Sequence, residues 1–156
     1  MKGKTSIFKY SIWGLICGLI FLVPIFPIFT LLPIFGLAEV LGEYFSDCVI
    51  GYKIAYILSL ILALIFDFLY LRKTVWKNTT DEKSGFGLLF FFNLLLYSLI
   101  NAFVFVAFVG TQAACYGNGQ LILGVIDSGP ISSIVIFVNG LVIDFVRQLK
   151  TNKIEE

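Results

Sequence analysis

Four apolar runs dominate the chain, and most polar positions gather between the runs instead of alternating along them. The runs cover residues 12–37, 54–71, 86–109 and 121–146. Each is long enough for an α-helix to cross a hydrocarbon core of about 30 Å, which takes about 17 to 25 residues. The pattern therefore predicts an all-α protein with four transmembrane helices joined by short connections.

The first run contains helix-breaking residues. Pro24, Pro27 and Pro33 each lack the N–H that would continue the helical hydrogen bonds. We therefore expect a proline-kinked first helix whose freed carbonyls find partners inside the protein, because lipid offers none. Gly14 and Gly18 form a GxxxG spacing, which allows two helices to approach closely.

The last run is interrupted by the sequence GVIDSGPISS, residues 124–133. In one geometry the helix starts near Pro130, and residues 120–129 form an interfacial or re-entrant lead-in. In the other, one helix runs from Leu121 and is kinked at Pro130. Both geometries place Asp127 near the outer surface, where holding a carboxylate costs much less than at the membrane centre.

A polar face marks the third run. Asn93, Tyr97 and Asn101 recur every four residues, so they lie on one side of a helix. Because an asparagine in hydrocarbon needs a hydrogen-bond partner, we expect this face to be buried in the bundle. Asn139 in the fourth run lies as far from the cytoplasmic boundary as Asn93, and we predict that these two side chains are in contact.

Composition supports a membrane protein. Hydrophobic residues make up 59% of the 156 residues and charged residues 13%, with a mean hydropathy of +0.97. So few polar side chains cannot cover a soluble globule of this size. No stretch between the runs is long enough to bury a core of its own, so we expect residues 1–156 to form a single domain.

Charge placement predicts the topology. Of the 11 Lys and Arg residues, only Lys53 falls outside three clusters, which lie before the first run, between the second and third, and after the fourth. The positive-inside rule then predicts an antiparallel bundle with both termini in the cytoplasm. We expect a plasma membrane, and a bacterial inner membrane in particular. A cleaved signal peptide is the alternative for the first run, but its apolar part exceeds the usual 7 to 15 residues.

Two further pairs of residues, one of aspartates and one of cysteines, complete the pattern. Asp67 and Asp144 lie near the inner ends of their runs and are expected to reach headgroups or cytoplasmic cations, Asp144 pairing with Arg147. Cys48 and Cys115 fall in the two outer connections, where an oxidising compartment favours a disulfide.

The residue inventory argues against enzymatic chemistry. The chain has no histidine, no CxxC and no Walker loop, so we expect no metal, no cofactor and no nucleic-acid partner. Lipoprotein signal peptidases resemble this chain in length and number of spans. Such a protease needs a second aspartate at the outer end of the third span, where AFVGTQAACYGNG has no carboxylate.

These observations predict a small membrane protein that binds another membrane protein, as an accessory subunit, a toxin-immunity protein or an exclusion factor. Small bacterial toxin-immunity proteins resemble it in their four-span plan. The partners are then the lipid bilayer and either a membrane protein or a second copy of the chain. The alternative is an oligomeric ion or small-solute transporter that uses Asp127 and broken helices. The candidate binding residues are Asp127, Asn93, Tyr97, Asn101 and Asn139.

Overall fold

The computed structural model describes residues 8–72, 86–108, 115–117 and 121–155, and these ranges contain helices and no strands. The helices are α1 (Lys9–Phe21), α2 (Ile25–Phe45), α3 (Cys48–Leu71), α4 (Phe86–Phe108) and α6 (Leu121–Glu155).

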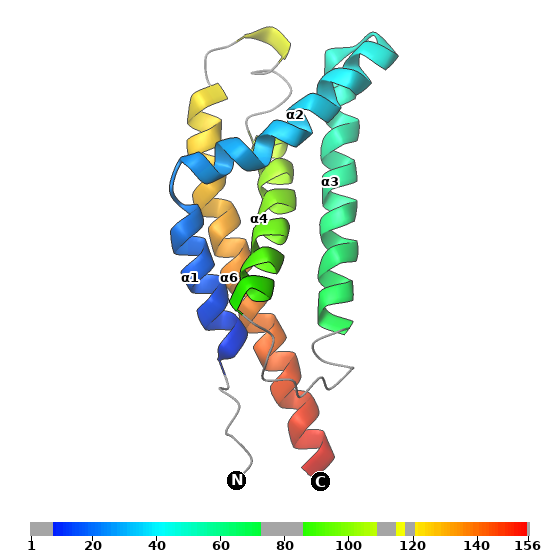
Figure 1. The fold of residues 1–156 in the computed structure, drawn as a ribbon. Helices are drawn as coiled ribbons and strands as arrows, with labels where there is room; N and C mark the ends of the chain where they lie inside the picture. Colours follow the sequence, from blue (N-terminus) through cyan, green and yellow to red (C-terminus); the bar gives the residue numbers. More distant parts are fainter. Residues whose placement is uncertain (1–7, 73–85, 109–114, 118–120, 156) are drawn as a thin grey trace.

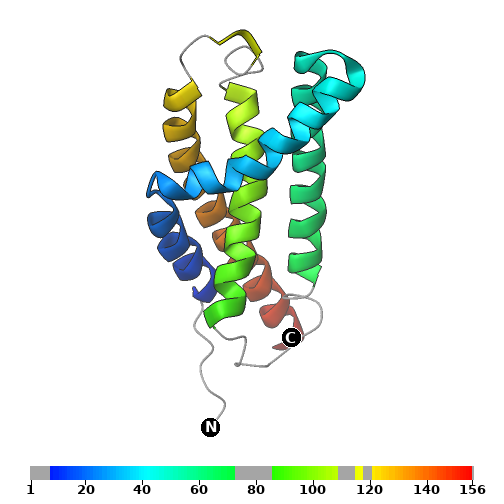
Figure 2. The same ribbon diagram turned by 45° about the horizontal axis from the view of Figure 1, so that its top comes forward.

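Four of these helices, α2, α3, α4 and α6, are long and apolar enough to cross a membrane, and α1 is a shorter apolar helix. Four helices that could span a membrane is the number that the sequence predicted. Helix α1 packs mainly against α6, α2 packs against α3, and α4 contacts all of the others. In Figure 1, α2 crosses obliquely over the bundle while α1, α3, α4 and α6 run more nearly lengthwise, and Figure 2 shows the same oblique path.

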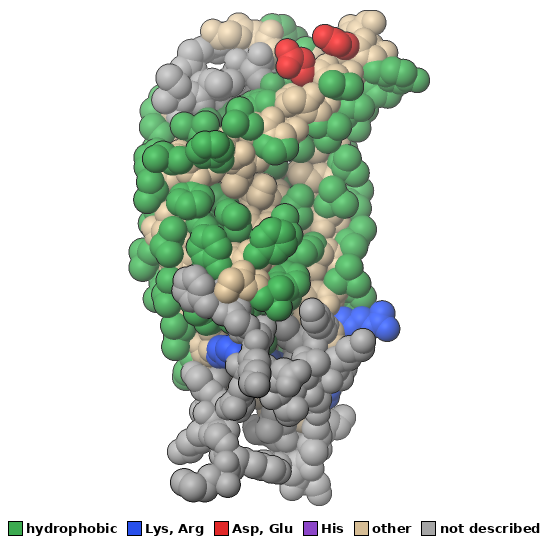
Figure 3. All heavy atoms as spheres, viewed as in Figure 1, with side chains coloured by type: hydrophobic (Ala, Val, Ile, Leu, Met, Phe, Trp, Pro, Cys, Tyr) green, Lys and Arg blue, Asp and Glu red, His purple; other side chains and the backbone are tan. Residues whose placement is uncertain are grey.

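The start of α1 and the end of α6 lie at one end of the bundle, and the turn between α2 and α3 lies at the other (Figure 1). On the face drawn in Figure 3, acidic side chains gather near that turn, basic side chains gather toward the opposite end, and apolar side chains cover the band between them. Several of the cations on which the predicted topology rests lie outside the described residues: Lys2, Lys4, Lys73, Lys77 and Lys83.

The first apolar run forms two helices, not one kinked helix. Helix α1 ends at Phe21 and α2 begins at Ile25. Pro24 and Pro27 cannot donate to the carbonyls of Ile20 and Val23, their partners in a regular helix. Those carbonyls instead accept from residues three positions on, Val23 N–H at 3.3 Å and Phe26 N–H at 3.0 Å. The prolines therefore separate two helices, and the expected single helix over 12–37 is wrong.

The last run decides between the two geometries left open above. Helix α6 is continuous from Leu121 and contains Pro130 in its interior. The geometry in which the helix starts near Pro130 is therefore wrong, and so is the re-entrant lead-in. Proline is tolerated inside membrane helices where other groups satisfy the freed backbone, and Pro130 itself is exposed on α6.

The second spanning helix begins earlier than the apolar pattern suggested, at Cys48 and not near Ile54. The Asp47 carboxylate accepts hydrogen bonds from the N–H groups of Val49 at 2.8 Å and Ile50 at 3.3 Å. This is an N-cap, which satisfies backbone donors that have no partner within the helix. Ser46 before it is left-handed, with φ 55°, and closes the turn from α2.

Glycines set the closest approach between helices. A Cβ at Gly14 would lie 2.9 Å from the Ile136 carbonyl oxygen, and one at Gly140 would lie 2.6 Å from that of Tyr10. Gly14 and Gly18 thus both lie against α6, which is the close approach that a GxxxG spacing allows. Gly51 has the same role between α3 and α2, where an added Cβ would lie 2.5 Å from the Ala38 carbonyl oxygen.

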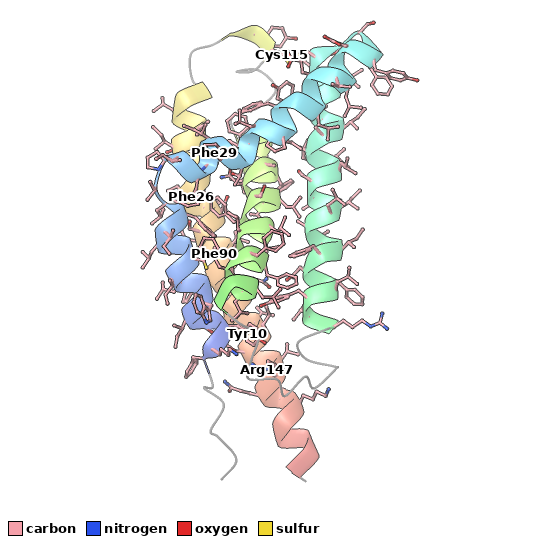
Figure 4. All side chains as sticks on the ribbon, viewed as in Figure 1. Tyr10, Phe26, Phe29, Phe90, Cys115 and Arg147 are labelled. Atoms are coloured by element: carbon pink, nitrogen blue, oxygen red, sulfur yellow. A yellow bond between two sulfur atoms is a disulfide. The ribbon has the colours of Figure 1, made fainter. Side chains whose placement is uncertain are left out.

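The aromatic core lies where α1 ends. Phe21 is fully buried, and its ring centroid lies 5.2 Å from that of Phe26 and 5.5 Å from that of Phe90. Figure 4 labels Phe26 and Phe90 beside this junction. Phe29, one turn further along α2, is 65% exposed. The break between α1 and α2 is therefore packed on one side and exposed on the other.

Candidate functional site

Asn101 is the centre of a polar network that joins three helices. It is fully buried on α4, and its Nδ2 donates to the hydroxyls of Ser128 at 3.1 Å and Ser132 at 3.3 Å on α6. Its Oδ1 lies 3.3 Å from the Thr30 hydroxyl on α2, which also lies 3.1 Å from the Pro27 carbonyl. Both ends of this amide are therefore bound within the chain, on two different helices.

Tyr97, one turn before Asn101, seals the break between α1 and α2. It is fully buried, and its hydroxyl donates to the carbonyl oxygen of Phe21, the last residue of α1, at 3.2 Å. Gly129 leaves room at this point, because an added Cβ would lie 3.1 Å from Pro27 and 3.4 Å from the Tyr97 hydroxyl. The expectation that carbonyls freed by the broken helix find partners inside the protein is confirmed here.

Asn93 and Asn139 face one small cavity of about 10 Å³ between α1, α3, α4 and α6. Their hydrogen bonds go elsewhere: Asn139 Nδ2 donates to Asp67 Oδ1 at 2.8 Å, and Asn93 Nδ2 donates to the Leu89 carbonyl one turn back. The two asparagines therefore line the same cavity, but the hydrogen bond of Asn139 goes to Asp67 and not to Asn93. The sequence pattern matched their depth but did not show that α3 would bring a carboxylate to the same place.

Asp144 has a role that the sequence did not indicate. It is 2% exposed, and its Oδ2 accepts from the Ser11 N–H at 2.7 Å and the Ser11 hydroxyl at 2.5 Å. Its Oδ1 accepts from the Tyr10 N–H at 3.3 Å. A carboxylate on α6 thus caps the start of α1, where unpaired donors and the helix dipole both favour negative charge.

Arg147 lies one turn after Asp144 and contributes to the same junction. Its guanidinium carbon lies 4.9 Å from the centroid of the Tyr10 ring, a cation–π geometry. Figure 4 shows the two side chains together at the end of the bundle where α1 begins. The expected role of Asp144 as a surface ion-pair partner is replaced by a buried contact between α1 and α6.

Asp127 does not join the interior network. It is exposed on α6, although its neighbours Ser128 and Gly129 are buried. It lies six residues into the helix, about 9 Å from the start at 1.5 Å per residue. The carboxylate is therefore on an outward face, near the end of the bundle that carries the α2–α3 turn.

The end of the bundle at the α2–α3 turn carries a groove of about 560 Å³ between these two helices. Its walls include Phe35, Glu39 and Glu43 on α2 and Tyr52 on α3. A disulfide between Cys48 and Cys115, with 5.9 Å between the Cα atoms, ties the start of α3 to the connection between α4 and α6. These are the two cysteines that the sequence analysis paired.

Comparison of this chain with protein-family models, with curated proteins and with solved structures finds no match. The site is therefore interpreted from its geometry alone. Among the described residues, no group of three or more His, Cys, Asp or Glu side chains is placed to hold a metal ion.

Four contributors to these sites were missed by the sequence reasoning: Thr30, Ser128, Ser132 and the groove residue Tyr52. Ser128 and Ser132 are four residues apart, so they share a helical face, and Asn101 needed a partner at a similar depth. That spacing was the available signal. It could not be separated from ordinary serine content in a membrane helix without knowing which helix lies beside α4.

Proposed function

We propose that this chain is a non-enzymatic membrane protein that binds another membrane protein, as an accessory subunit, a toxin-immunity protein or an exclusion factor. In this proposal it lies in a plasma membrane, specifically a bacterial inner membrane, with both termini in the cytoplasm. The α2–α3 turn and its groove then face the outside.

The observation that carries the proposal is that the buried polar side chains of α4 form hydrogen bonds within the chain itself. The polar face of α4 is directed to other helices of the same chain: Asn101 to α2 and α6, and Tyr97 to the end of α1. Such buried hydrogen bonds fix how helices pack and leave those groups little capacity to bind a passing solute. Recognition is then left to the outward surfaces, which include the groove between α2 and α3.

The second candidate is an oligomeric transporter or channel, and the position of Asp127 favours it. An exposed carboxylate on a membrane helix is costly toward lipid and less so in a water-filled path between subunits. In this alternative, the outward face of α6 lines a path between copies of the chain.

Copurification separates the two candidates. The tagged protein is extracted from its native membrane in a mild detergent, and the bound polypeptides are identified by mass spectrometry. We expect a distinct membrane protein in a fixed ratio to the chain. Proteoliposomes that contain the chain alone should carry no ion or solute flux. A flux that is abolished by Asp127→Asn, with no copurifying polypeptide, would support the transporter instead.

A further inference from the structure

The groove between α2 and α3 has an apolar floor and an acidic rim. Phe35, Ala38 and Tyr52 are the main apolar residues of the floor, and Glu39 and Glu43 stand on the rim. The two glutamates are one helical turn apart on α2, so their carboxylates project from the same face. The groove has a volume of about 560 Å³ and is open on its outer side, so it is not an enclosed ligand cavity.

The rim charges are not neutralised within the described part of the chain. Glu39 and Glu43 are exposed and have no hydrogen bond or ion pair there, while the third carboxylate of the groove, Asp47, caps α3. Lys53 is the one cation in the described residues around this turn. The sequence from Val109 to Gln120, in the other outer connection, adds no charged residue. This end of the protein therefore has an excess of negative charge.

The walls of the groove are held in place before any ligand arrives. The Cys48–Cys115 disulfide fixes the start of α3, and Gly51 allows the α2 backbone to lie directly against α3. Phe35 and Tyr52 pack edge to face, with ring centroids 6.2 Å apart. A preorganised surface loses less free energy on binding than one that must be ordered by its ligand.

We propose that this groove is the docking surface for a basic polypeptide segment of the partner. This inference rests on the proposed function. Lys or Arg side chains complement the two glutamates, and their aliphatic stems, or neighbouring apolar residues, cover the floor. Tyr52 and Phe35 also offer aromatic faces for a guanidinium. A divalent metal ion fits less well, because no three acidic or sulfur ligands converge in the described residues.

The test uses the full-length protein in nanodiscs of phosphatidylcholine, a zwitterionic lipid. Binding of a nine-residue oligo-arginine peptide is measured by calorimetry, with an oligo-glutamate peptide of the same length and Ca²⁺ alone as comparisons. We expect the basic peptide to bind at least tenfold more tightly than the acidic one, and its affinity to fall as salt rises. The variant Glu39→Gln/Glu43→Gln should weaken binding at least tenfold.

The control is Arg72→Gln, which removes an exposed charge at the end of α3, at the opposite end of the bundle from the groove; it should bind the peptide as the wild type does. The inference is overturned if Glu39→Gln/Glu43→Gln binds as tightly as the wild type, if both peptides bind alike, or if Ca²⁺ binds and the peptide does not. If a native partner copurifies equally with the wild type and the double variant, the groove is not the docking surface, while the proposed function stays intact.

Discussion

At the scale of single residues, the buried carboxylate of Asp144 has the clearest energetic role. It accepts from two backbone N–H groups and one hydroxyl at the start of α1, 133 or 134 positions away in sequence. The first N–H groups of a helix have no partner within it, and at Ser11 this start of the helix is buried. Asp144 therefore provides what a local capping residue provides in other helices, since Phe8 at the N-cap position makes no side-chain bond.

We predict that Asp144→Ala lowers the free energy of unfolding by about 2 to 3 kcal/mol, because buried backbone donors lose a charged acceptor. Asp144→Asn keeps one acceptor oxygen and should cost about 1 kcal/mol. Unfolding by sodium dodecyl sulfate in mixed micelles measures both. Equal stability of the alanine variant and the wild type would show that the cap contributes nothing.

Asn101 and Asn93 provide a second comparison, because they are of one residue type on one face of α4. Asn101 bonds to α2 and α6, whereas the Asn93 amide donates to its own helix. Asn101→Ala should therefore lower the free energy of unfolding by about 1 to 2 kcal/mol, and Asn93→Ala by clearly less. The same micelle titration reports the difference. A larger loss for Asn93→Ala would contradict the assignment of the network to Asn101.

At the scale of helices, the packing depends on a few glycines at the points where two backbones meet. Gly140 faces the start of α1, and Gly51 faces α2 between Ala38 and Gly42. Gly36, in the middle of α2, has no atom within 4 Å of an added Cβ. An alanine at Gly140 or Gly51 would crowd the neighbouring helix, whereas an alanine at Gly36 would change only the helix propensity.

We predict that Gly140→Ala and Gly51→Ala each destabilise the protein by about 1 to 3 kcal/mol, because the added methyl group pushes two backbones apart. Gly36→Ala should be neutral or stabilising by up to about 1 kcal/mol, since alanine is the better helix former. Thermal unfolding in detergent distinguishes these results. If all three substitutions shift the unfolding temperature alike, the close approach does not govern stability.

The helix scale also shows how far the sequence could be read. The apolar runs predicted four spanning helices, and the spacing of Tyr97 and Asn101 predicted their burial, because both follow from local periodicity. The division of the first run depended on prolines that the sequence displays, but a kink and a complete break leave the same apolar pattern. The Asp144 cap and the Asn139–Asp67 bond needed knowledge of which helices are neighbours, and one sequence does not contain it.

At the scale of the whole molecule, the account depends on which end faces the cytoplasm. The C-terminus should lie in the cytoplasm, because the cationic segments are retained there. A reporter that is active only in the cytoplasm should therefore be active when it is fused to the C-terminus. In intact cells treated with a reductant, a membrane-impermeant maleimide should label Cys48 and Cys115 and leave the buried Cys17 unlabelled. Labelling that requires cell lysis would reverse the assignment, and the groove would then face the cytoplasm.

The most direct measurement of the central claim is site-specific photocrosslinking in living cells. A photoreactive amino acid replaces Tyr44, which is 80% exposed beside the groove, or Phe145, which is 60% exposed near the opposite end of α6. We predict a crosslinked adduct with one membrane polypeptide from position 44 and none from position 145. Adducts from position 145 alone, or from neither position, would contradict recognition of a partner at the α2–α3 end of the bundle.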